Sequence, residues 1–283
     1  MAAKLLTPDE AGEVLITGCA GGIGRALALE FRSRGFRVLA TARKPETLRD
    51  LEAAGASIAA LDVTDPASIA ALDLGGRGIG IAINNAGYGA MGPLIEIGSD
   101  ELYRQFATNV IAPLAVTRAV VSAMIAARRG RIVDVSSVSG VMTTPFAGAY
   151  CASKAALNAI DEALRMELAP FGVDVITLQP GAIRSEFGAH AAESIGRSPV
   201  GERYYAALDE AIAARAVAGQ QNAMLAEDFA RAAVDAILAR RPAAIVRVGP
   251  MSRLLPRMRR WLPVRVRERM LSRRSQLDRV GSR

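Results

Sequence analysis

The chain has 283 residues, of which 51% are hydrophobic and 22% are charged. This composition suits one globular domain with a large core and excludes a low-complexity or disordered chain. Two cysteines, Cys19 and Cys151, cannot build a disulfide framework, so we read both as reduced and expect a cytoplasmic protein. The first ten residues hold no uninterrupted apolar stretch, and we expect no later run that approaches the roughly 20 apolar residues needed to span a bilayer.

The net charge of +7 is unevenly distributed along the chain. Residues 251–283 hold eleven arginines and two acidic residues, so the first 250 residues carry a net charge of −2. We therefore expect a domain over residues 1–250, followed by a basic extension.

The basic extension has the pattern of short amphipathic helices, because Leu254, Met258, Trp261 and Leu262 recur at helical spacing between arginines. Such helices either pack against the domain or a second subunit, which we favour, or make a peripheral contact with an anionic membrane surface. Nucleic acid is not an expected partner, because Trp261 alone could stack on a base.

A short apolar strand, 14–17, runs directly into a glycine-rich turn. Glycines let backbone amides approach a phosphate closely at the start of the following helix. The turn therefore predicts a dinucleotide site made by Thr17, Gly18, Gly21, Gly22, Ile23 and Gly24.

The second expected strand, 36–41, leads to Arg43 and Lys44. An acidic side chain at this point would bind the ribose hydroxyls of NAD, whereas a cation favours the additional phosphate of NADP. The pattern indicates NADP, and the alternative is that Arg43 is a solvated loop residue.

Tyr150 and Lys154 lie four residues apart in an expected helix, so they share one face, about 6 Å apart along the axis. An ammonium close to a phenol should lower its pKa from about 10 by roughly 1 to 3 units, which would let Tyr150 exchange protons near neutral pH. Ser137, after the apolar run 131–135, offers a second hydroxyl for the same substrate oxygen. Asn109 lies within a long expected helix, 99–128, where an asparagine is usually just a satisfied polar group.

Taken together, Thr-Gly-x-x-x-Gly-Ile-Gly at 17–24, Asn-Asn-Ala-Gly at 84–87, Ser137 and Tyr-x-x-x-Lys at 150–154 resemble the short-chain dehydrogenase/reductase family. The resemblance covers residues 14–248. It implies an α/β fold, a single doubly wound Rossmann-type domain with a seven-stranded parallel sheet. It also implies reversible hydride transfer between a nicotinamide and a carbonyl or alcohol carbon, with no metal.

The family resemblance assigns Tyr150 as the proton donor and acceptor, Ser137 as the holder of the oxygen, and Lys154 as the residue that lowers the pKa of Tyr150 and binds the nicotinamide ribose. It assigns Asn109 to a water that links Lys154 to solvent. The remaining cofactor contacts that it implies are Arg43, Lys44, Asp62, Val63, Asn84, Asn85, Ala86, Gly87, Pro180, Gly181, Ile183 and Ser185.

The segment 140–154 is most similar to the branch that holds 17β-hydroxysteroid and retinol dehydrogenases. We therefore expect a fairly apolar ketone, aldehyde or alcohol as the substrate, a mobile lid at 186–221, and a homodimer or homotetramer. The alternatives are a 3-oxoacyl thioester reductase, which would need a basic surface near the lid, and an NADP-binding module without turnover at a membrane surface.

Overall fold

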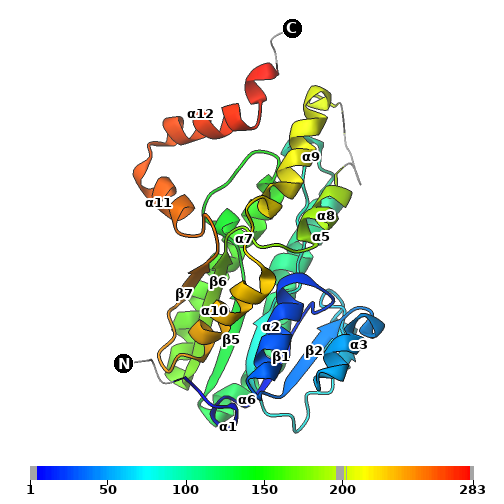
Figure 1. Ribbon diagram of the computed structural model, residues 1–283, viewed down its shortest axis with the longest axis vertical. Helices are drawn as coiled ribbons and strands as arrows, with labels where there is room; N and C mark the ends of the chain where they lie inside the picture. Colours follow the sequence, from blue (N-terminus) through cyan, green and yellow to red (C-terminus); the bar gives the residue numbers. More distant parts are fainter. Residues whose placement is uncertain (1–4, 196–200, 202, 281–283) are drawn as a thin grey trace.

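The computed structural model describes residues 5–195, 201 and 203–280, and its centre is one seven-stranded sheet (Figure 1). All neighbouring strands are parallel, in the order β3-β2-β1-β4-β5-β6-β7. The predicted doubly wound Rossmann-type fold is confirmed. The strands are β1 (Glu13–Ile16), β2 (Val38–Ala42), β3 (Ser57–Ala60), β4 (Ile79–Asn84), β5 (Gly130–Val135), β6 (Val173–Pro180) and β7 (Ile245–Val248).

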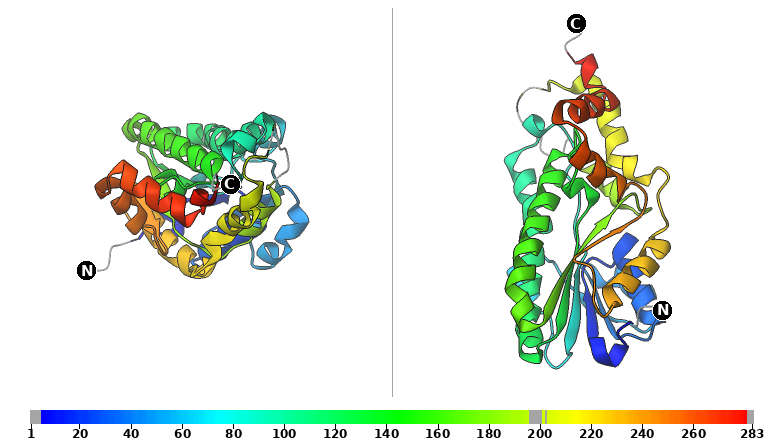
Figure 2. Two further views of the ribbon diagram at one scale, coloured as in Figure 1. Left: turned by 90° about the horizontal axis from the view of Figure 1, so that it is seen from above. Right: turned by 90° about the vertical axis from the view of Figure 1, so that its left-hand side faces the viewer.

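Helices cover both faces of the sheet, because its central strands are apolar on both sides. One core lies between the sheet and α2, α3 and α10, and the other lies between the sheet and α4, α6 and α7 (Figure 2). These helices are α2 (Gly22–Ser33), α3 (Arg49–Ala53), α10 (Ala226–Leu238), α4 (Pro66–Ala70), α6 (Ala112–Ala127) and α7 (Gly148–Leu168).

The long helix expected at 99–128 is present, but a π-helical turn divides it. It consists of α5 (Ser99–Phe106), the π turn Ala107–Ile111 and α6. It has 29 residues, and an 18-residue window within it has a mean hydropathy of 1.9. By length and composition it could cross a membrane, so the expectation that no stretch approaches that limit is wrong. A core helix passes the same test, and α6 packs along β4 and β5.

The expected lid segment contains two helices, α8 (Phe187–Glu193) and α9 (Asp209–Val217), which contact each other. The extension contains α11 (Leu254–Trp261) and α12 (Val264–Arg274), drawn in orange to red in Figure 1. Beyond α12, Leu277 packs against the lid residues Leu208 and Ile212. The parts of the lid at 196–200 and 202, and of the extension at 281–283, lie outside the described residues.

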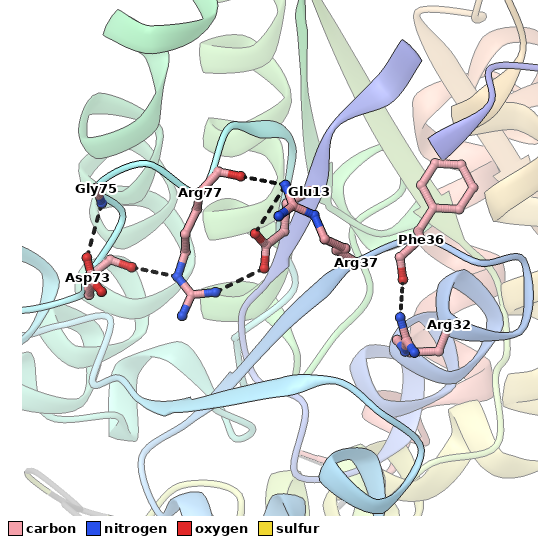
Figure 3. Close-up of polar contacts among 7 residues, drawn as sticks. All are labelled: Glu13, Arg32, Phe36, Arg37, Asp73, Gly75 and Arg77. Carbon is pink, nitrogen blue, oxygen red and sulfur yellow. Dashed lines mark hydrogen bonds and ion pairs between the residues drawn. The ribbon is translucent and has the colours of Figure 1, made fainter. Parts of the chain in front are cut away.

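At the amino ends of the strands, near α1 (Pro8–Ala11), charged side chains pair with one another (Figure 3). Glu13 is only 3% exposed, and its carboxylate accepts a hydrogen bond from Arg77 Nη1 at 3.0 Å. Arg37 Nη2 lies 3.8 Å from the same carboxylate and donates to the Arg77 carbonyl. The buried charge of Glu13 is therefore compensated within the protein.

Candidate active site

The glycine-rich turn lies at the carboxyl end of β1 and opens α2. Gly18 (φ 71°) passes so close to β4 that a Cβ on it would lie 2.8 Å from Ala86 Cα. Gly22 (φ 54°) is equally close to Ser185, where a Cβ would lie 2.9 Å from Ser185 Cβ. Because Gly21 precedes α2 without a capping side chain, the first N–H groups of α2 face an anion site.

Thr17 and Asn85 hold the glycine-rich turn against the end of β4. The Asn85 side chain donates to the carbonyl oxygens of Thr17 and Gly18, each at 2.9 Å. Thr17 Oγ1 accepts from the N–H groups of Asn85 and Ala86, each at 3.0 Å. Two of the predicted cofactor segments are thus joined into one rigid unit.

Asn84 differs from its neighbour, because its side chain lies in the core beneath α6. Asn84 Nδ2 donates to Asp134 Oδ1 at 2.6 Å and to Thr117 Oγ1 at 3.3 Å. The structure brings Asn85 and Ala86 to the glycine-rich turn, whereas the Asn84 side chain joins β4, β5 and α6.

A cavity of about 540 Å³ lies between the glycine-rich turn and the segment after β6. Its walls include Gly21, Gly22 and Ser185, and Gln220 of the lid segment accepts a hydrogen bond from the Ser185 N–H at 3.0 Å. A dinucleotide's pyrophosphate needs close approach to the backbone, which glycines allow, and N–H donors, which the helix start supplies. These residues therefore fit the cofactor.

The other predicted residues at the end of β6 and after it lie next to the cavity wall that contains Ser185. Ile183 is buried and pairs with Met224, and Pro180 is the last residue of β6. Gly181 contacts the residue before the extension so closely that a Cβ would lie 1.8 Å from the Pro250 oxygen. These residues shape the nicotinamide end of the predicted site.

Arg43 and Lys44 follow β2 and are exposed, as a phosphate-binding pair would be. Asp62 follows β3 close to them. Two hydrogen bonds from Thr64 lower the pKa of Asp62, burial opposes them to a smaller extent, and the charge of Arg43 adds the smallest lowering effect. The structure thus brings the predicted residues Arg43 and Asp62 to one corner of the sheet, beside the half-buried Val63.

Tyr150 and Ser137 come together as predicted. Tyr150 lies in the first turn of α7 and is 8% exposed, while Ser137 is the second residue after β5. Ser137 Oγ accepts the Ser139 N–H at 3.0 Å, so its own proton is free for another oxygen. Burial raises the pKa of Tyr150 to about 12, although a hydrogen bond with Ser137 and, to a smaller extent, the charge of Arg215 lower it. At neutral pH, Tyr150 is therefore a protonated phenol.

The expected lowering of the pKa of Tyr150 is not found in this structure, because burial raises that pKa. Lys154 Nζ donates to the Val135 carbonyl at 2.7 Å, and the effect of its charge on Tyr150 stays a prediction. Burial also lowers the pKa of Lys154 itself to about 8, against the opposing charges of Asp134 and Asp161. The physical reason is that loss of water around both groups outweighs their attraction to nearby charges.

Asn109 lies in the π turn, fully buried, beside the catalytic pair. Its Nδ2 donates to the Tyr88 carbonyl at 2.9 Å and to Ser153 Oγ at 3.1 Å, while its Oδ1 accepts the Tyr88 N–H at 3.1 Å. A Cβ on Gly87 would lie 3.0 Å from Asn109 Oδ1 and 3.7 Å from Lys154 Nζ. The three predicted residues therefore meet, and the role of Asn109 through a water stays a prediction.

Two residues of the lid segment also belong to this site but were not predicted. The ring of Phe187 lies 5.3 Å from the Tyr150 ring, measured between centroids. Arg215 Nε donates to Thr144 Oγ1 at 2.9 Å, and its charge acts on Tyr150. One signal could have indicated Arg215, which is the single charged residue in the run 211–219.

The arrangement joins an anion site at a helix start, a corner with cations for a phosphate, and a serine–tyrosine pair beside a lysine. These features define the class of dinucleotide-binding oxidoreductases that exchange a proton with a substrate oxygen. In the described residues, no group of three or more histidine, cysteine or acidic side chains could hold a metal ion.

The comparisons with known proteins agree with this class. The family description "short chain dehydrogenase" matches residues 13–195, and the chain belongs to that family. An uncharacterised oxidoreductase of Escherichia coli, YbbO, is 40% identical over 195 residues, which are 66% of this chain and 71% of that protein. An NADPH-dependent 3-dehydrocapnine reductase of Ornithobacterium rhinotracheale is 31% identical over 253 residues, or 83% of this chain and 87% of that protein.

The predicted likeness to retinol dehydrogenases is also found. Mouse retinol dehydrogenase 5 is 36% identical over 182 residues, which are 61% of this chain and 57% of that protein. Among solved structures, a short-chain dehydrogenase of Streptomyces avermitilis has a TM-score of 0.76 at 28% identity, covering 96% of this chain and 98% of its own. One of Sphingobium yanoikuyae in complex with NADPH has a TM-score of 0.67 at 26% identity, covering 96% of both chains. The protein is thus an NAD(P)-binding oxidoreductase.

Proposed function

We propose that this protein is an NADP(H)-dependent enzyme that interconverts a fairly apolar ketone or aldehyde and its alcohol. The observation that carries the proposal is the pair of Ser137 and Tyr150, two hydroxyl groups that meet in an apolar setting. Met91, Ala147 and Ala191 pack in the same cluster as Tyr150, so the surroundings favour an apolar substrate.

Arg43 and Lys44 support NADP(H), since exposed cations after β2 suit the additional phosphate. The NADPH-dependent 3-dehydrocapnine reductase among its relatives supports the same choice. When bound, the nicotinamide supplies or takes the hydride. Ser137 would hold the carbonyl oxygen, and Tyr150, protonated at neutral pH, would donate the proton to that oxygen.

The test is the change Tyr150→Phe, which removes only the phenol oxygen. We expect NADPH oxidation with apolar methyl ketones to fall at least about 100-fold, because general acid catalysis of this kind is worth about 10²–10⁴. The Kd of NADPH, measured by its fluorescence, should stay unchanged. The control Tyr103→Phe alters a residue that is 75% exposed on α5 and should keep full activity. Undiminished reduction by the Tyr150→Phe variant would contradict the proposal.

A 3-oxoacyl thioester reductase is a second candidate, because the structure places the basic extension beside the lid. Leu277 contacts the lid residues Leu208 and Ile212, and eleven arginines lie between residues 251 and 283. Such a surface suits an acidic carrier protein. Comparing kcat/KM for a 3-oxoacyl group on an acyl carrier protein and on a small thiol distinguishes the two candidates. A large preference for the carrier would favour the second.

We also propose a homodimer or homotetramer in which α6 and α7 meet their counterparts. An apolar groove of about 330 Å³ runs between these helices, and the neighbouring Ile111 and Met166 are 62% and 68% exposed. Light scattering of the purified chain and of a Met166→Glu variant tests this assembly.

A cytoplasmic location and a peripheral membrane contact through residues 251–283 stay predictions.

A further inference from the structure

Arg215 lies on α9 at the mouth of the active site. Its neighbour Ala216 is 4% exposed and packs in one cluster with Tyr150, Ala147 and Met91. α9 therefore lies directly against the start of the catalytic helix, and Arg215 is half-buried beside Tyr150.

The loop before the catalytic helix holds this arginine in place. Arg215 Nε donates to Thr144 Oγ1 at 2.9 Å. Two residues later, Phe146 adopts φ 62°, a left-handed conformation that is rare for a bulky side chain and that often marks functional sites. Because Thr144 is neutral, this contact orients the guanidinium without compensating its charge.

No carboxylate among the described residues forms an ion pair with Arg215. Burial lowers the pKa of Arg215, Cys151 and Tyr150 oppose this, and the charge of a second cation, Arg274 of α12, adds a smaller lowering effect. Partly buried charges in proteins are normally paired, since removal of water is costly without a counter-ion. Among the described residues, Arg215 thus lacks the carboxylate partner that a partly buried charge normally has.

The position of Arg274 is fixed by the packing of the extension. Three residues after it, Leu277 joins the cluster formed by Phe146, Leu208 and Ile212, so the end of the extension lies on the lid segment. Figure 2 shows α11 and α12 over the same end of the molecule as α9. Arg215 of α9 and Arg274 of α12 thus approach each other beside the lid segment.

We propose that Arg215 is a substrate-binding residue that holds an oxyanion, a carboxylate or phosphate group carried by the carbonyl substrate, with Arg274 at its outer edge. The planar guanidinium fork matches such groups in a bidentate manner. The substrate would then be an amphiphile, with its carbonyl at Ser137 and Tyr150 and its anionic group under the lid. This inference rests on the proposed function and adds the substrate's charge to it.

The phosphates of the cofactor are another source of oxyanions, but the structure provides for them elsewhere. The first turn of α2 faces the cavity with Ser185, and Arg43 lies at the corner beyond β2. We therefore expect Arg215 to affect binding of the substrate and not of NADPH.

The experiment compares kcat/KM for three probes with the same methyl ketone, namely 9-oxodecanoate, its neutral methyl ester and 9-oxodecyl phosphate. We expect the unaltered protein to prefer at least one anionic probe over the ester by at least about tenfold. Arg215→Met should lower the ratio of kcat/KM for the anionic probe to kcat/KM for the ester to about one, and leave the Kd of NADPH within about twofold. Arg215→Lys should restore part of the preference for the anionic probe. The control Arg203→Met alters a lid arginine that pairs with Asp209, and it should keep the full preference.

The relative rates with carboxylate and phosphate identify which oxyanion the site prefers. Equal rates for anionic and neutral probes in the unaltered protein would overturn the inference, as would an equal loss with all three probes in Arg215→Met or a raised Kd of NADPH. In each of these cases the ester is still reduced, so the proposed function stands. If the unaltered protein binds NADPH but reduces none of the probes, the proposed function fails and the inference falls with it.

Discussion

The two ends of the central sheet handle charge in opposite ways. At the amino ends of the strands, the buried Glu13 pairs with Arg77 at 3.0 Å and lies 3.8 Å from Arg37. At the carboxyl ends, Arg43 and Arg215 form no ion pair among the described residues, although Arg215 is half-buried. The charges at the amino ends are compensated within the fold, whereas Arg43 and Arg215 are left available for the ligands that we propose.

This difference separates structural from functional charges without any reference to a substrate. Removing a charge at the amino ends should lower stability and leave catalysis unchanged. Removing one at the carboxyl ends should alter binding or turnover and leave stability unchanged. Each of the following measurements would confirm or break this separation.

The largest effect is expected for Arg77→Ala. The change leaves the Glu13 carboxylate, 3% exposed, with only Arg37 at 3.8 Å as a counter-ion. We expect unfolding in urea to become easier by about 2–3 kcal/mol, less than the roughly 3–5 kcal/mol of a fully buried pair because Arg77 is 28% exposed. The kcat/KM of the folded protein should not change. Arg49→Ala, at an exposed position on α3, is the control, and a catalytic loss without a stability loss would break the comparison.

The next largest effect is expected for Arg43→Ala, which should weaken the binding of NADPH and leave the binding of NADH unchanged. A charge-assisted hydrogen bond to a phosphate is worth about 1.5–3 kcal/mol, so the Kd of NADPH should rise about 10- to 100-fold. The midpoint of urea unfolding should stay the same, because Arg43 is exposed. Arg49→Ala again serves as the matched control. An equal rise in the Kd of NADH would show that Arg43 does not bind the 2′-phosphate.

The smallest effect concerns the pH dependence of the two reaction directions. Tyr150, with a pKa raised to about 12, is protonated across the neutral range and can donate its proton in reduction. Oxidation of an alcohol needs the phenolate, whose fraction rises tenfold with each pH unit below that pKa. We expect oxidation to accelerate by about tenfold from pH 7 to pH 8, which corresponds to about 1.4 kcal/mol, with little change in reduction. A flat oxidation profile, together with reduction that slows as the pH rises, would show that the pKa of Tyr150 lies below 7 when the cofactor is bound.

Much of the fold could be predicted, because it depends on local patterns. The glycines of the turn, the apolar strands and the residues after each strand indicate the parallel sheet and the corner where Arg43 and Asp62 meet. The order of Ser137, Tyr150 and Lys154 along the chain is enough to predict that these side chains share one site, and their catalytic roles stay predictions.

The electrostatics and the lid could not be predicted in the same way. The pKa of Tyr150 depends on how completely the packing of Phe187 and α9 removes water, and spacing along one helix says nothing about this. The approach of Arg215 depends on a long segment between β6 and α10 whose sequence has no clear periodicity. Contacts between residues far apart in the chain, such as Arg215 with Thr144, become visible only when the chain is folded.

The extension is attached to the rest of the protein at both of its ends. Directly before its base, the Pro250 oxygen accepts from the Ala182 N–H at 3.1 Å, and at its far end Leu277 packs on the lid segment. The family match covers residues 13–195, yet Arg215, Arg274 and the whole extension lie beyond them. Two relatives with the same predicted catalytic residues but different sequences after β6 would therefore have different substrate entrances. Substrate selectivity could then change in evolution while the reaction stays the same.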